Sequence, residues 1–323
     1  MSKDLVSNLH YLRGLMSNES FNQLLNIFWL RPETALWRYL DIKAMRDFEF
    51  VGQSLDFGCG DGLFSFIRAG GKFDPLFDAF QKTANLDRFY EKVDVFDAYD
   101  DSYAPLVTKR PDYQISVGFD HKPNLLKKAA GLGLYTETVA GDGNEPLIFE
   151  DESFDTIFSN IVYWLEDPAK VLGELSRILR PSGRLCLMLP NTTLPEYSFF
   201  NRLFVQTKNP AWGWLDGIDR GRLSDNIKQA ASDEQWRDVF NASGLKVHHH
   251  SQHLSKHIIQ AWDIGFRPMF PAFLKAVEAI PADKLADVKT EWVESLKRFA
   301  LPFAATETRD NPTNAFHCYI LTK

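Results

Sequence analysis

The chain has 323 residues, of which 45% are apolar and 24% charged, as in a globular protein with one large core or a core with additions. Lys and Arg number 36 against 43 Asp and Glu, the formal net charge is -7, and no basic stripe is visible, so we expect no nucleic-acid substrate. The cysteines are far apart and lack CxxC spacing, which argues against a disulfide framework or a structural zinc site and for a reducing compartment: Cys59, Cys186 and Cys318.

The N-terminal segment predicts helices rather than a targeting signal. It has no basic start followed by an apolar core, and the apolar run 24–30 is too short to cross a bilayer, so we expect a cytoplasmic protein without a transmembrane segment. Apolar residues at i, i+3, i+4 and i+7 predict one helix, namely Phe21, Leu24, Leu25 and Phe28. Pro32 then starts a second helix, with Trp37, Leu40 and Ala44 on one face.

Strands and helices alternate along the rest of the chain. We predict strands at 51–57, 113–119, 154–160, 185–189, 245–252 and 317–323, and helices at 167–179 and 233–243. This alternation indicates an α/β fold with a mainly parallel sheet. Two stretches do not fit it, 63–111 and 253–314, and we interpret them as additions. The second should contain a long amphipathic helix through Leu285, Val288, Trp292, Leu296 and Phe299.

A glycine-rich turn follows the first strand, in the sequence Asp56-Phe-Gly-Cys-Gly-Asp-Gly62. Glycines let a backbone turn sharply and approach a ligand closely, and the next helix would point its N–H groups at that ligand. A GxGxG motif alone is a weak signal, and its value depends on the elements around it.

Those elements resemble one family. LDFGCGDG, then GDGNEPLIFEDESFDTIFSN, a helix, and RILRPSGRLCLMLPN resemble class I S-adenosylmethionine-dependent methyltransferases, in the broad bacterial group acting on small molecules, quinones, sugars and lipids. The resemblance covers 51–62 and 113–191, with a weaker continuation around 231–250. It implies a Rossmann-like, mainly parallel seven-stranded sheet with helices on both faces and S-adenosyl-L-methionine as cofactor, leaving S-adenosyl-L-homocysteine.

The resemblance also implies residue roles. Gly58, Cys59, Gly60 and Gly62 would form the loop under the methionine and ribose parts of the cofactor, and Asp56 would face the methionyl amine, directly or through water. Asp120 would accept both ribose hydroxyls, since one carboxylate can take two donors. His121 would lie beside the adenine, Asp142 with Gly143 would bind the adenine amino group, and Asn160 would line the methionine pocket.

Two features depart from the family pattern. The interval from Gly62 to Asp120 is long, so we infer an insertion at about 70–111; Asp94 and Asp97 are the alternatives to Asp120 for the ribose. Relatives often carry a Glu-His pair after the fourth strand, whereas this chain has Val-Tyr-Trp-Leu at 162–165.

The resulting division has four parts. We expect an N-terminal helical cap at 1–50, a cofactor-binding core at 51–191 with the insertion inside it, an acceptor-side lid and helical insertion at 192–316, and a last core strand at 317–323.

The acceptor side contains aromatic residues and histidines. Candidates for the acceptor wall are Tyr163, Trp164, Tyr197, Trp212 and Trp214, and packing in a lid explains them equally well. His253 and His257 are candidate bases, although surface or packing roles are commoner for histidines. We expect no metal site.

Three functions remain open on sequence grounds. The favoured one is methyl transfer to O or N of a small organic or glycan-linked acceptor. The second is a non-catalytic methyltransferase-like module that binds the cofactor. A nicotinamide dehydrogenase shares the glycine-rich turn, but the GDG and RPSG elements have no role there. The sequence does not specify the oligomeric state.

Overall fold

A computed structural model describes residues 18–80, 97–215, 227–307 and 311–323. Its centre is a seven-stranded sheet in the order β5-β4-β1-β6-β7-β9-β8. The strands are β1 (Ser54–Phe57), β4 (Ile115–Asp120), β5 (Tyr135–Ala140), β6 (Phe154–Ser159), β7 (Leu179–Pro190), β8 (Lys246–His253) and β9 (Phe316–Thr322). Only β9 runs against its neighbours, pairing antiparallel with both β7 and β8. The predicted mainly parallel seven-stranded sheet is confirmed.

Strand β7 begins earlier than predicted. A strand is expected at 185–189, but it already starts at Leu179, which pairs with Phe154, so Pro181, Ser182 and Gly183, residue types that favour turns, fall inside it. The next pair is Thr156 with Arg184, so the register shifts and the turn-forming residues lie within an irregular part of the strand.

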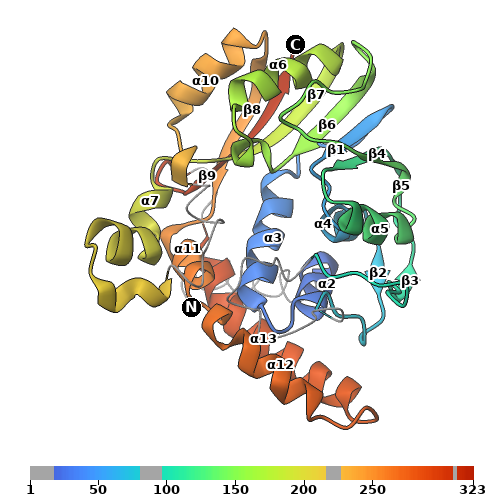
Figure 1. Ribbon diagram of the computed structural model, residues 1–323, viewed down its shortest axis with the longest axis vertical. Coiled ribbons are helices and arrows are strands. Elements are labelled where there is room, and N and C mark those ends of the chain that lie inside the picture. Colours follow the sequence, from blue (N-terminus) through green and yellow to red (C-terminus); the bar gives the residue numbers. More distant parts are fainter. Residues whose placement is uncertain (1–17, 81–96, 216–226, 308–310) are drawn as a thin grey trace, which may run out of the picture.

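Helices cover both faces of the sheet (Figure 1). On one side lie α6 (Pro168–Ile178) and α10 (Asp233–Ala242), and on the other α3 (Pro32–Ala44), α4 (Leu63–Arg68) and α5 (Pro123–Gly131). Side chains cap the first turns of α6 and α10: Asp167 accepts from the backbone N–H groups of the first turn of α6, and Ser232 forms a capping box with Gln235.

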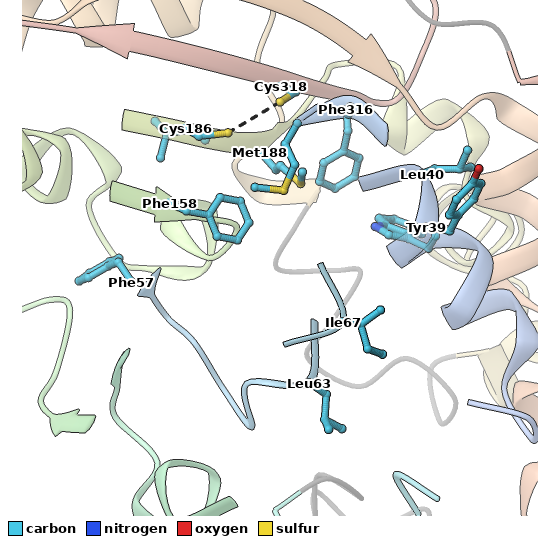
Figure 2. Packing of buried hydrophobic residues seen from close by; sticks show 14 of the residues in the cluster. Tyr39, Leu40, Phe57, Leu63, Ile67, Phe158, Cys186, Met188, Phe316 and Cys318 are labelled. Carbon is cyan, nitrogen blue, oxygen red and sulfur yellow. Dashed lines mark hydrogen bonds between the residues drawn. The ribbon is translucent and has the colours of Figure 1, made fainter. Parts of the chain in front are cut away.

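The N-terminal segment is built into the core through α2 (Glu19–Ile27) and α3. The predicted face of α2 is buried, and Trp37, Leu40 and Ala44 of α3 are buried as well. Figure 2 shows Phe158, Met188 and Phe316, from β6, β7 and β9, in one row, with Tyr39 and Leu40 of α3 on the side of Phe316. The same view shows Cys186 and Cys318, whose Sγ atoms lie 4.0 Å apart without a disulfide. Residues 18–50 thus share one hydrophobic core with the sheet.

The predicted additions have structure of their own. Within 70–111, β2 (Lys72–Phe73) and β3 (Val107–Lys109) form a separate two-stranded sheet. The described residues of 192–316 contain, besides β8 and α10, α7 (Leu194–Tyr197), η3 (Phe200–Gln206), η4 (Pro210–Trp212), α11 (Lys256–Asp263), η5 (Arg267–Met269), α12 (Phe270–Glu278) and α13 (Leu285–Thr306).

Only part of the apolar face predicted for the long helix α13 is buried. Leu296 is buried and Trp292 is half-buried, donating from Nε1 to the carbonyl oxygen of Trp29 at 2.9 Å. Val288 and Phe299 are 40% and 55% exposed, so part of the predicted apolar face is uncovered. Across the described ranges, no helix has both the length and the apolar character needed to cross a membrane.

Candidate functional site

The glycine-rich turn after β1 lies across the carboxyl ends of β1 and β4. The backbone N–H groups of Gly58 and Cys59 both donate to the carbonyl oxygen of Phe119, at 2.8 and 3.0 Å. Gly60 donates to Oδ2 of Asp120 at 3.0 Å. The backbone φ angles are +83° at Gly58 and +57° at Gly60, a region that residues with a Cβ rarely adopt, so this turn requires glycine at both positions.

Asp120 is the last residue of β4 and is 8% exposed. Its Oδ2 accepts from Gly60, and its Oδ1 accepts from the backbone N–H of Lys122 at 2.9 Å. Each carboxylate oxygen can accept a further donor, so this side chain can still bind two hydroxyl groups. His121 is exposed, with Nδ1 3.5 Å from Oδ1 of Asp120.

The alternative acidic residues lie differently. Asp97 binds Nζ of Lys122 through both carboxylate oxygens, at 2.9 and 3.0 Å, and its own carbonyl accepts from Asn124 at the start of α5. It therefore has a partner in the first turn of that helix. Asp94 lies outside the described residues.

The segments after β5 and β6 complete this edge of the sheet. Gly141 donates from its backbone N–H to the carbonyl oxygen of Asp120 at 3.1 Å, which holds the loop containing Asp142 and Gly143 beside β4. Asp142 is exposed, and its Oδ1 accepts from the backbone and side chain of Asn144. Asn160 is half-buried directly after β6. The structure thus brings the predicted cofactor residues to the ends of four adjacent strands.

The glycines of this region differ in how much room a side chain would have. A Cβ on Gly58 would lie 2.1 Å from Cγ1 of Ile161, and one on Gly143 would lie 2.9 Å from Cζ of Phe57. A Cβ on Gly60 would meet no described atom within 4 Å. The turn therefore packs closely against protein at Gly58 and faces open space at Gly60, where a ligand can approach the backbone.

Asp56 has partners that the sequence did not indicate. It is 2% exposed, and its Oδ2 accepts from Oγ of Ser65 and from the hydroxyl of Tyr135, each at 2.6 Å. Burial raises the pKa of Asp56 to about 6, although the two hydrogen bonds and the positive charge of the nearby Arg68 lower it. The carboxylate is thus anchored to the protein, with the two donors on the same oxygen.

Two of the predicted acceptor-wall residues adjoin this edge. Tyr163 and Trp164 belong to η2 (Val162–Trp164), directly after β6; Tyr163 is buried and Trp164 is 43% exposed. The Tyr163 ring lies 5.8 Å from that of Phe316, which in turn packs on Trp37 at 5.2 Å. Trp37 also packs on Trp262 at 4.9 Å, so an aromatic cluster joins η2 to α3 and α11.

The other three acceptor candidates lie between β7 and α10. The Tyr197 hydroxyl donates to the carbonyl oxygen of Thr313 at 2.6 Å, which ties α7 to the segment before β9. Trp212 is half-buried in η4 and Trp214 is 46% exposed just after it. Figure 1 shows the helical stretch after α7 on the side of the molecule away from β4 and β5.

The two candidate histidines differ sharply in environment. His253 ends β8 and is 3% exposed; its Nε2 lies 2.9 Å from Oδ1 of Asp41 in α3. Its Nδ1 is buried and has no hydrogen-bond partner among the described residues. His257 is exposed on α11.

Several residues of this region could not be assigned to the site from the sequence. Tyr135 and Ser65 belong to no motif, and only their pairing with Asp56 shows their relevance. Asp41 lies 212 positions from His253, so spacing could not link them. Trp37 lies on the predicted apolar face of its helix, so packing in the hydrophobic core was a sufficient explanation for it.

Comparison with known proteins adds a family match. Residues 102–187 match the family described as "Methyltransferase domain". The chain is similar to demethylmenaquinone methyltransferase of Chlamydia pneumoniae, with 35% identity over 89 residues, 26% of this chain and 38% of the relative. It is also similar to a malonyl-[acyl-carrier protein] O-methyltransferase of Methylococcus capsulatus, with 36% identity over 98 residues, 30% of this chain and 29% of the relative. The chain thus spans less than two fifths of the length of either.

Among solved structures, a methyltransferase of Thermotoga maritima shares 15% identity at a TM-score of 0.47, covering 93% of this chain and 98% of the other. A phosphoethanolamine N-methyltransferase of Haemonchus contortus shares 14% identity at a TM-score of 0.44, covering 94% and 60%.

Proposed function

We propose that the chain, whose residues 102–187 match a methyltransferase domain, is a class I S-adenosylmethionine-dependent methyltransferase that transfers the methyl group to O or N of a small organic or glycan-linked acceptor. One observation carries the proposal: the glycine turn, Asp120 and the loop of Asp142 converge at one edge of the sheet, with open space at Gly60. In open α/β sheets, ligands bind outside the carboxyl ends of the strands.

The residues at this edge fit the cofactor. The free acceptor capacity of Asp120 suits two ribose hydroxyls, and the open space at Gly60 admits a ligand against the backbone. We assign the remaining contacts as the family resemblance implies. His121, Asp142 and Gly143 would contact the adenine, and Asp56, Cys59 and Asn160 the methionine part.

The protein's own contribution is placement of the acceptor. Bound S-adenosylmethionine supplies an electrophilic methyl group, so the chain has to align the acceptor atom and exclude water. We propose that Tyr163 and Trp164 form part of the acceptor wall, since they follow β6 beside Asn160. Tyr197, Trp212 and Trp214 would belong to the lid above it.

A hydroxyl acceptor needs a base more than an amine does. Of the two candidate histidines, His253 suits this role better than His257, because Asp41 holds Nε2 and leaves Nδ1 without a partner among the described residues. We propose a cytoplasmic location, since all three cysteines are unpaired.

The test uses S-adenosylmethionine with a labelled methyl group, incubated with the protein and an extract of its source cell. The extract is then separated into lipid, small polar and macromolecular fractions. We expect label in one fraction, and clearly less of it when Asp120→Ala replaces the wild type at a cofactor concentration below saturation. Cofactor binding without label in any fraction would instead favour the non-catalytic binding module. Binding of NADH without binding of S-adenosylmethionine would favour the dehydrogenase.

A further inference from the structure

The ring of Tyr135 occupies a space that two glycines leave for it. Tyr135 is the first residue of β5 and is 7% exposed. A Cβ on Gly62, in the glycine turn, would lie 3.0 Å from its Cε2, and a Cβ on Gly118, in β4, would lie 2.9 Å from its Cδ1. The turn and the neighbouring strand both lack side chains where this ring passes.

This placement brings the Tyr135 hydroxyl to Asp56. The hydroxyl donates to Oδ2 at 2.6 Å, and Oγ of Ser65 in α4 donates to the same oxygen at 2.6 Å. Neither donor uses Oδ1. Short hydrogen bonds to a carboxylate favour its ionised form, so both groups oppose the cost of burying the charge.

The charge on Asp56 is finely balanced. Burial raises the pKa of its carboxyl group to about 6, and Asp120 adds to that rise. The hydrogen bonds from Ser65 and Tyr135 and the positive charge of Arg68 lower it. Cys59 and Tyr113 also lie near Asp56, and their own pKa values are raised, so both are neutral at pH 7. Ionisation at neutral pH therefore depends on the two hydroxyl donors.

We infer that Tyr135, together with Ser65, is a positioning residue of the cofactor site: its hydroxyl holds the Asp56 carboxylate ionised and oriented for the ammonium group of the cofactor's methionine part. This inference rests on the proposed function. It adds that recognition of the amino-acid end of the cofactor is sensitive to pH near 6, whereas recognition of its adenosine end is not.

The test compares two ligands by calorimetry between pH 5.5 and 8.5. S-adenosylhomocysteine carries the ammonium group, and 5′-methylthioadenosine shares the adenosine and sulfur but lacks the amino-acid part. For the wild type, we expect the affinity for S-adenosylhomocysteine to fall as the pH drops through about 6, because the carboxylate becomes protonated. The affinity for 5′-methylthioadenosine should change little.

Tyr135→Phe keeps the ring in its space and removes only the hydroxyl. Loss of one hydrogen bond to the carboxylate should raise the pKa of Asp56 by roughly one unit or more, and weaken S-adenosylhomocysteine binding at pH 7 by about 2- to 10-fold. The pH at which binding fails should move upward, while 5′-methylthioadenosine binding stays within about 2-fold of wild type. Ser65→Ala should act in the same direction and serves if Tyr135→Phe does not fold.

The matched control is Tyr113→Phe, because Tyr113 lies near Asp56 but its hydroxyl pairs with Arg68. It should leave the preference between the two ligands unchanged. Equal weakening of both ligands in Tyr135→Phe, or an unshifted pH profile, would overturn the inference and leave the proposed function intact. Failure of the wild type to bind either ligand would instead overturn the proposed function and the inference with it.

Discussion

Gly58 and Gly60 lie two residues apart in one turn, yet a methyl group would meet different surroundings at each. At Gly58 it would collide with Ile161, whereas at Gly60 it would enter open space. Both residues have positive φ, so both substitutions should cost about 1–2 kcal/mol of backbone strain. Any difference between the two variants in stability or in ligand affinity therefore comes from what the added methyl group meets: packed protein at Gly58 and open space at Gly60.

We expect Gly58→Ala to lower the melting temperature clearly more than Gly60→Ala. Gly60→Ala should fold but lose affinity for S-adenosylmethionine, because its methyl group occupies the space in which the ligand approaches. Thermal unfolding and calorimetric titration of both variants measure the two effects. If Gly60→Ala bound the cofactor like the wild type, the open space at Gly60 would have to be assigned another role.

Asp120→Ala tests the ribose contact. Removing the carboxylate should weaken S-adenosylmethionine binding by about 1–3 kcal/mol, the range for a hydrogen bond to a charged group. It also removes the acceptor for the backbone N–H of Gly60, so the turn should loosen. Asp97→Ala is the matched control, since Asp97 pairs with Lys122 nearby. A larger loss of affinity in Asp97→Ala would transfer the ribose role to that residue.

At the scale of elements, α3 is attached to the edge strand β8 by a buried pair and a more exposed one. His253 and Asp41 are buried and 2.9 Å apart, and Oδ2 of Asp41 also accepts from Arg38 at 3.3 Å. Nearer the start of β8, His249 lies 3.7 Å from Asp47, which follows α3. Both pairs join the N-terminal segment to the sheet, but only the first lies out of reach of solvent.

We expect Asp41→Ala to lower the free energy of unfolding by about 1.5–3 kcal/mol, because a buried hydrogen bond to a charged group is lost. Asp47→Ala is the control on the same two segments and should cost less than about 1 kcal/mol, as exposed ion pairs do. Urea denaturation measures both. Equal effects of the two substitutions would show that burial of the His253–Asp41 pair adds no stability.

At the scale of the whole molecule, stability should fall in acid through His317. This residue of β9 is fully buried, and burial, with His250 nearby, lowers its pKa to about 3. Between pH 3 and about 6.5, the unfolded chain binds a proton at this residue that the folded chain does not. The free energy of unfolding therefore decreases as the pH falls, by at most about 1.4 kcal/mol per pH unit.

His317→Gln removes this titration, so its stability relative to the wild type should improve by about 2 kcal/mol between pH 6.5 and 5. Asp56, with its raised pKa, acts in the opposite direction, but it is common to both proteins and cancels in the comparison. His257→Gln, at an exposed position of α11, should run parallel to the wild type. Parallel curves for His317→Gln would show that His317 is not the source of acid sensitivity.

The sequence by itself predicted six of the seven strands of the sheet, the helices at 167–179 and 233–243, and the family resemblance, but it did not predict β5. These are local properties, because hydrophobic period, capping residues and a glycine-rich turn are written in adjacent positions. Asp120 could be chosen over Asp97 only because strand and helix signals flank it directly.

Only the tertiary structure decided which distant residues meet. Tyr135 reaches Asp56 across 79 positions and Asp41 reaches His253 across 212, and neither pair leaves a signal in spacing. The length of β7 also depended on its pairing with β6, because the register of the two strands shifts where residues 180–183 of β7 lie. Such contacts arise when strands and helices assemble in three dimensions, and they depend on that arrangement rather than on any local pattern.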